Sequence, residues 1–247
     1  MKIFDLDGPV VRFMNKVADL MILNFWAMIC CIPLFTIGAS LTALNYMALK
    51  IVRDEECYIT RGFFKSFKEN FRQSTIIWVI ILVVAAFLGT DLYIIEKSGL
   101  EFGKLLKTVI TMFAVMATFT AMMAFPLQAK FDNPVKITLK NAFAVSILQF
   151  PKTFAMIILM FLPVAICYIS FGLFPVALLF GMSGPAYFSA QLYNVTFKKM
   201  EHQYERAQEE AKSSKAENDV AAEDEQEDER IFKDELDESI VTDNQTP

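Results

Sequence analysis

The residue types that most often carry out catalysis or bind metal ions are scarce in this 247-residue chain. Its single histidine, His202, lies where a polar C-terminal segment begins, so the apolar body lacks the commonest general base. The cysteines form no CxxC pair, and we interpret them as small apolar side chains; they are Cys30, Cys31, Cys57 and Cys167. We therefore predict no catalytic residue, no metal site, no cofactor and no enzymatic activity.

One acidic residue, Asp91, falls inside an apolar segment that is long enough to cross a membrane. An ionisable side chain within a membrane is costly and often marks an ion or proton pathway. Asp91 lies only four residues from the end of the segment at Ile95, so snorkelling or a pairing with Lys97 explains it more simply. The chain has no nucleotide-binding loop and no GxSxG or HExxH motif, and we expect no nucleic-acid partner.

The clearest physical pattern is an aromatic and basic segment at residues 60–73. At about 100° per residue in a helix, its phenylalanines share one side and its cations the other. The candidate residues for a docking surface are Phe63, Phe64, Phe67, Phe71, Lys65, Lys68 and Arg72. Such a helix suits the membrane interface, where aromatic rings bury and cations meet lipid headgroups. Two interpretations stay open: a membrane anchor for the loop, or a surface that a partner protein recognises.

Proline and glycine interrupt two apolar segments of the chain. The candidate residues of these broken helices are Pro33, Thr36 and Gly38 in the first segment, and Pro175, Gly181, Gly184 and Pro185 in the second. A helix that breaks at membrane depth exposes carbonyl and amide groups, which can bind a ligand. The same residues can instead serve only to reverse the chain.

Membrane-spanning helices must position these residues, because 55% of the chain is hydrophobic and only 21% is charged. We predict an all-α, polytopic transmembrane helical bundle over residues 1–200, with two cytoplasmic connecting helices. The six spans are expected at about 17–33, 37–52, 74–95, 105–129, 153–169 and 174–197. A single kinked helix across the first two spans would give five. We expect the second connecting helix, near residues 138–150, to pack on the bundle through Leu139, Phe143, Ile147 and Phe150.

Charge asymmetry indicates the orientation of these spans. Six lysines and arginines lie between Lys50 and Gln73, and four lysines lie between Lys130 and Lys152. Because such residues accumulate on the cytoplasmic side, both long connections and both termini are predicted to be cytoplasmic in a multi-pass protein of the cell membrane. Residues 201–247 hold 17 acidic side chains against 5 basic ones, which predicts a largely disordered acidic tail.

Two stretches of the chain also match each other at a shift of 78 residues. The shift places residues 39–44 on residues 117–122, and Thr60 on Thr138. Short matches between apolar segments also arise by chance, so an internal duplication and a coincidence both stay open.

The segments 31–44, 50–56, 58–59 and 63–71 together resemble the YesL family of bacterial membrane proteins. Their central features are Pro33, Thr36, Ile37 and Gly38, followed by the phenylalanine-rich segment. The resemblance covers roughly residues 8–205 and leaves out the acidic tail. It implies a membrane fold but no activity, because the function of the family is unknown. Association of its members with carbohydrate uptake and degradation systems implies an accessory role.

From these features we predict an integral membrane protein of unknown activity, whose environment is the lipid bilayer. The first hypothesis is a non-enzymatic accessory or regulatory factor for carbohydrate uptake, with a carbohydrate transporter permease as partner. The alternative is a small-solute transporter or channel component built around the two broken helices.

Overall fold

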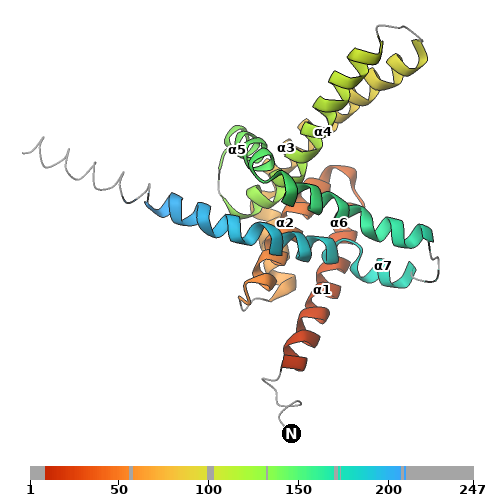
Figure 1. The fold of residues 1–247 in the computed structure, drawn as a ribbon. Helices are drawn as coiled ribbons and strands as arrows, with labels where there is room; N and C mark the ends of the chain where they lie inside the picture. The colour runs from red at the N-terminus through yellow and green to blue at the C-terminus, as the bar shows by residue number, and fades with distance from the viewer. Residues whose placement is uncertain are drawn as a thin grey trace, which may run out of the picture. The chain divides into compact units, whose positions relative to one another are not determined.

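The computed structural model describes residues 9–55, 58–98, 103–131, 133–169, 172, 174–206 and 209 (Figure 1). It separates into two compact units, Met1–Asn194 and Val195–Pro247. The described residues form helices and no strand, which confirms the predicted all-α fold. In the second unit, residues 195–206 are helical. Most of the predicted acidic tail, residues 207–208 and 210–247, lies outside the described residues.

The first apolar region forms two helices. Helix α1 covers Pro9–Cys31, a short 3₁₀ helix η1 covers Leu34–Thr36, and α2 covers Ile37–Val52. The break lies at Pro33, which supplies no backbone N–H to continue the first helix. The N-terminal end of α1 and the turn after α2 are joined by an ion pair between Lys16 and Asp54, with 2.7 Å between Nζ and Oδ1.

Helix α3 covers Ile59–Ser98 without a break. Its 40 residues make it about 60 Å long, twice the thickness of the hydrocarbon core of a bilayer. The predicted first connecting helix and the span after it are thus two halves of one helix. No proline or glycine lies between Gly62 and Gly89, so nothing in the sequence interrupts the helix at the boundary between its polar and apolar parts.

Helix α4 covers Gly103–Lys130 and lies beside α3 in the opposite direction (Figure 1). An ion pair between Glu96 and Lys107, with 3.5 Å between Oε2 and Nζ, joins the last part of α3 to the first part of α4. Helix α5 covers Val135–Leu148 and α6 covers Phe150–Ile169. Helix α7 covers Phe174–Phe180, and residues 183–194 continue as a further helix after a turn at residues 181–182. The segment predicted as a single sixth span is therefore divided in two.

Five of the described helical segments are long and apolar enough to cross a membrane. They are Val10–Cys31, Leu34–Val52, Ile59–Lys97, Leu105–Lys130 and Phe150–Tyr168. The core of the first unit is built where α1 to α4 meet, and its fully buried side chains include Leu23, Ala27, Ala43, Met47, Phe63, Ile77 and Met123. Large apolar side chains elsewhere are mostly exposed, as expected for surfaces that face lipid.

Helix α5 packs on the bundle through a side different from the predicted one. Its buried residues are Thr138, Ala142, Val145 and Ser146. Of the residues expected to pack there, Phe143 and Ile147 are exposed instead. Phe150 is the first residue of α6, and its ring centroid lies 5.1 Å from that of the buried Phe119 on α4. The prediction of this packing face was wrong because apolar spacing does not show which side has a partner, and Thr138 bonds to the buried Gln128 and so turns the small, polar side of α5 inward.

Candidate functional site

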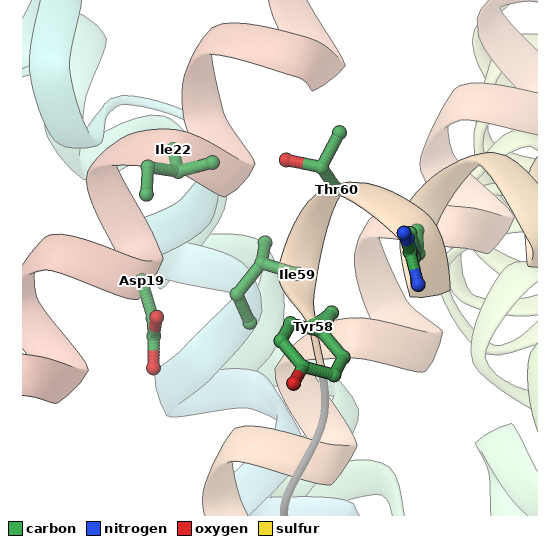
Figure 2. A pocket seen from close by; sticks show the side chains of 6 residues that line it. Asp19, Ile22, Tyr58, Ile59 and Thr60 are labelled. Atoms are coloured by element: carbon green, nitrogen blue, oxygen red, sulfur yellow. The ribbon is translucent and has the colours of Figure 1, made fainter.

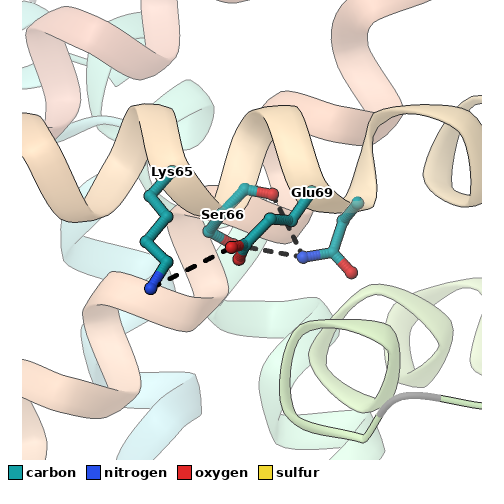
Figure 3. Close-up of polar contacts among 4 residues, drawn as sticks. Lys65, Ser66 and Glu69 are labelled. Carbon is teal, nitrogen blue, oxygen red and sulfur yellow. Dashed lines mark hydrogen bonds and ion pairs between the residues drawn. The ribbon is translucent and has the colours of Figure 1, made fainter.

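The first half of α3 carries the candidate docking residues. Its polar side is organised by contacts one helical turn apart (Figure 3). Lys65 Nζ lies 4.0 Å from Glu69 Oε1, and Asn70 Nδ2 donates to the backbone oxygen of Ser66 at 3.1 Å. Residues four apart lie on the same side of a helix, so these contacts follow directly from the sequence spacing.

The four phenylalanines form a continuous series of ring contacts along α3. Ring centroids are 6.2 Å apart between Phe63 and Phe67, and 5.5 Å apart between Phe67 and Phe71. Phe63 is fully buried, Phe67 and Phe71 are half-buried, and Phe64 is 39% exposed. Because Phe63 is buried against the bundle, it cannot belong to a docking surface. Phe64 is the most accessible aromatic residue of the segment.

The cations of this segment stay on the outer side of α3. Lys65, Lys68 and Arg72 are all exposed. Lys68 and Arg72 form no ion pair with any residue that the structure describes. The result is a basic strip beside Phe64, held on a helix whose other side is packed into the protein.

The first broken-helix segment has its polar groups occupied by the chain itself. The Thr36 hydroxyl lies 2.6 Å from the Cys30 oxygen and 2.7 Å from the Pro33 oxygen. The indole Nε1 of Trp78 donates to the Leu34 oxygen at 2.9 Å. These bonds satisfy carbonyl groups at the end of α1 and in the segment that leads to α2. The geometry favours a structural turn over a ligand site.

Gly38 allows α2 to approach α3 closely. A Cβ atom at this position would collide with the backbone oxygen of Ser74 and would lie 2.6 Å from Trp78 Cβ. One turn further along α2, the hydroxyl oxygens of Thr42 and Ser74 are 2.8 Å apart and buried. Ser40 donates to the Ala27 oxygen on α1 at 3.0 Å. Sequence reasoning singled out Gly38 but missed Ser40, Thr42 and Ser74, although small polar residues near a glycine are typical of helix crossings in membranes.

The second broken-helix segment is closed by Asn24, a residue of α1 that is 1% exposed. Its Oδ1 accepts hydrogen bonds from the backbone N–H groups of Met182 and Ser183, at 2.9 and 3.0 Å. Its Nδ2 donates to the Leu178 oxygen at 2.7 Å. One amide side chain thus satisfies the end of α7 and the start of the next helix. Asn24 is therefore a hydrogen-bonding residue between helices far apart in the sequence.

The remaining candidate residues of this second segment have structural explanations. Pro175 and Pro185 lie in the first turns of their helices, where the missing N–H group costs little. A Cβ atom on Gly181 would collide with the Ala177 oxygen, so the turn needs a glycine there. Gly184 has more room, since a Cβ atom would be 3.7 Å from Phe180 Cβ.

A buried polar network links α3, α4 and α5. Gln128 of α4 donates through Nε2 to Gln73 Oε1, and its Oε1 accepts a hydrogen bond from the Thr138 hydroxyl at 3.0 Å. Gln128 thus bonds to two helices other than its own, through Gln73 of α3 and Thr138 of α5. Both atoms of the amide are satisfied within the protein, so the network stabilises the packing of three helices and offers no free group to a solute.

Asp91 does not pair with Lys97 as the simpler sequence interpretation suggested. The Lys97 ammonium lies over the Tyr93 ring, 5.1 Å from its centroid. No other residue that the structure describes forms an ion pair with Asp91. Within the described residues, no group of three or more histidine, cysteine or acidic side chains gathers where it could hold a metal ion.

Comparison with known proteins gives a family for part of this bundle. Residues 20–92 match the model of a family described as a protein of unknown function, DUF624. This match confirms the resemblance to the YesL family, whose members carry the same domain. It covers about half of α1, all of α2 and most of α3, and so includes the first broken helix and the aromatic segment. No curated protein and no solved structure matches the chain.

Proposed function

We propose that this protein is a non-enzymatic accessory or regulatory factor of the cell membrane that assists carbohydrate uptake by binding a transporter permease. The basic strip of α3, Lys65, Lys68 and Arg72 beside the exposed Phe64, carries the proposal. It is held rigidly, because Phe63 anchors the opposite side of the same helix in the core. The link to carbohydrate uptake rests on the resemblance to the YesL family.

The chemistry of the strip favours a protein partner with acidic groups. Lys68 and Arg72 have no ion-pair partner among the described residues, and Phe64 adds an aromatic side chain that gains by burial. Complementary charge at an interface gives specificity and speeds association, and aromatic residues often supply binding energy.

The orientation with both termini in the cytoplasm is part of the same proposal. The Lys16–Asp54 ion pair places the start of α1 beside the turn that follows α2. The strip begins a few residues beyond this turn, so many cations gather at one end of α1, α2 and α3. The preference of such residues for the cytoplasmic side supports the orientation and places the strip where it can reach a permease.

The alternative, a small-solute transporter or channel component, receives less support. A solute site at the two broken helices would need backbone carbonyl and N–H groups that are free to bind a ligand. At these helices, the side chains of Thr36 and Asn24 already form hydrogen bonds with such groups. The accessory role needs no solute site within the bundle.

The experiment is photocrosslinking with a photoreactive phenylalanine analogue in place of Phe64, in cells grown on different polysaccharides. The matched control carries the analogue in place of Phe87, which is also exposed but lies in the apolar second half of α3. We expect mass spectrometry to identify a transporter subunit captured from position 64 and not from position 87, with less capture in a Lys68→Glu background. Lipid adducts alone at position 64, or equal capture from both positions, would contradict the proposal.

A further inference from the structure

A groove of about 540 Å³ with both polar and apolar lining opens between α1 and the start of α3 (Figure 2). Its volume is in the range of small-molecule binding sites. It is lined by Asp19, Ile22, Tyr58, Ile59, Thr60 and Arg61. The Asp19 side chain comes from α1, and Tyr58 and Ile59 line the opposite wall.

The groove contains one acidic and one basic side chain that do not pair with each other. Asp19 has no hydrogen-bonding or ionic partner among the described residues. The Arg61 guanidinium lies over the Tyr58 ring, 5.7 Å from its centroid. This is the only contact of Arg61 with an aromatic ring among the residues that the structure describes. Asp19 also belongs to a helical segment long and apolar enough to cross a membrane, where an unpaired carboxylate is costly. A cationic ligand would remove that cost.

Aromatic side chains hold the two walls of the groove together. The Trp26 indole on α1 donates from Nε1 to the Thr60 hydroxyl at 3.2 Å, and its ring centroid lies 4.8 Å from that of Phe64. Tryptophan and tyrosine gather where a membrane meets water, at the depth of lipid headgroups. The groove therefore has the composition expected of a site at that depth.

An apolar stripe runs along α1 from the groove. Ile22, Phe25 and Ile29 are all exposed, and their spacing of three or four residues places them on one side of the helix. Seven residues of helix extend about 10 Å, so the stripe provides a path for the first part of an acyl chain that starts at the groove. A soluble ligand would not need such a path.

We propose that this groove binds the headgroup of a membrane phospholipid that carries both a primary ammonium and a phosphate, as phosphatidylethanolamine does. Asp19 accepts hydrogen bonds from the ammonium, Arg61 donates to the phosphate, and an acyl chain lies along the stripe on α1. A choline headgroup offers the carboxylate no N–H donor, and a glycerol headgroup has no cation. The site therefore prefers ethanolamine over both.

The test is to purify the full chain from nanodiscs made of equal parts of phosphatidylethanolamine, phosphatidylcholine and phosphatidylglycerol, and to measure the retained lipids by mass spectrometry. We expect roughly a tenfold enrichment of phosphatidylethanolamine over phosphatidylcholine, as for one charge-assisted hydrogen bond. Asp19→Asn removes this preference, and Arg61→Gln lowers the retention of all three lipids. Both variants should fold, because neither side chain is buried.

Two matched controls come from the far end of α3. Asp91→Asn removes another unpaired carboxylate, and Lys97→Gln removes another cation stacked on a tyrosine; neither should change lipid retention. No preference among the three lipids, or equal losses in the controls, would overturn the proposal. Stabilisation by free phosphoethanolamine in nanodiscs of pure phosphatidylcholine, without lipid enrichment, would reassign the groove to a soluble ligand. The photocrosslinking result at position 64 does not depend on any of these outcomes.

Discussion

The first half of α3 and the helix α5 both follow a turn after an apolar helix, yet they present opposite kinds of side chain to the bundle. Phe63 of α3 is fully buried, while Phe143 of α5 is 46% exposed. On α5 the buried residues are instead small or polar, as Ala142 and Thr138 are. An amphipathic pattern therefore locates an apolar side without telling whether protein or lipid covers it.

Local room and polar partners decide which side packs inward. Gly62, beside Phe63, faces Met47 so closely that a Cβ atom would lie 2.7 Å from its sulfur. On α5, Thr138 reaches the buried Gln128, and this bond fixes the polar side toward the bundle. Thr60, which the 78-residue shift places on Thr138, remains exposed and accepts a bond from Trp26. Two similar segments thus pack differently because their partners differ.

The largest effect that tests this difference is expected from Phe63→Ala. Truncating a buried phenylalanine removes its packing and leaves a cavity, which costs about 3–5 kcal/mol of unfolding free energy. Phe143→Ala, at an exposed position, should cost much less. Reversible unfolding in mixed micelles, followed by circular dichroism, measures both. Equal losses in the two variants would show that α5 also buries its aromatic side.

The next effect is expected at the crossing of α2 and α3. Gly38→Leu places a side chain against the backbone of Ser74, which cannot move aside as a flexible side chain can. Overpacking costs roughly 1–3 kcal/mol, and here we expect the upper end of that range. Gly89→Leu on the same α3 is the control, because a Cβ atom there meets nothing within 4 Å. Thermal denaturation with size-exclusion analysis compares the two, and a Gly38→Leu protein as stable as the control would argue against the close approach.

A smaller effect is expected on α5. Ala142→Leu inserts a larger side chain at a buried position, and we expect a loss of about 1–2 kcal/mol because a short helix can shift to accommodate it. Ala144→Leu, two residues away and exposed, should leave the stability unchanged. The same unfolding assay distinguishes them. A larger loss for Ala144→Leu would show that α5 packs through a side other than that of Ala142.

The sequence predicted the features that depend on local composition. Apolar length predicted an all-α membrane fold, and the chain does break at Pro33, between α1 and α2. The sequence did not predict features that depend on contacts between distant residues. Asn24 bonds to Met182 and Ser183, more than 150 residues away, and no spacing rule connects them. The sequence also did not predict that α3 is one continuous helix. A change from polar to apolar composition suggests the end of one helix and the start of another, but a helical backbone can continue across such a change.

The smallest effect is expected on the outer side of α3, and it bears on the proposed partner surface. Lys65 and Glu69 form an exposed pair with 4.0 Å between charged atoms, in the less favourable order for a helix. A double-mutant cycle with Lys65→Gln and Glu69→Gln should give a coupling below about 0.5 kcal/mol. A surface that contributes so little to folding can change its charges without loss of structure, which is what a docking surface requires. A coupling well above that value would mean that the strip stabilises the bundle itself. A loss of partner capture in Lys68→Glu could then result from a loss of folding, and the folding of this variant would have to be measured as well.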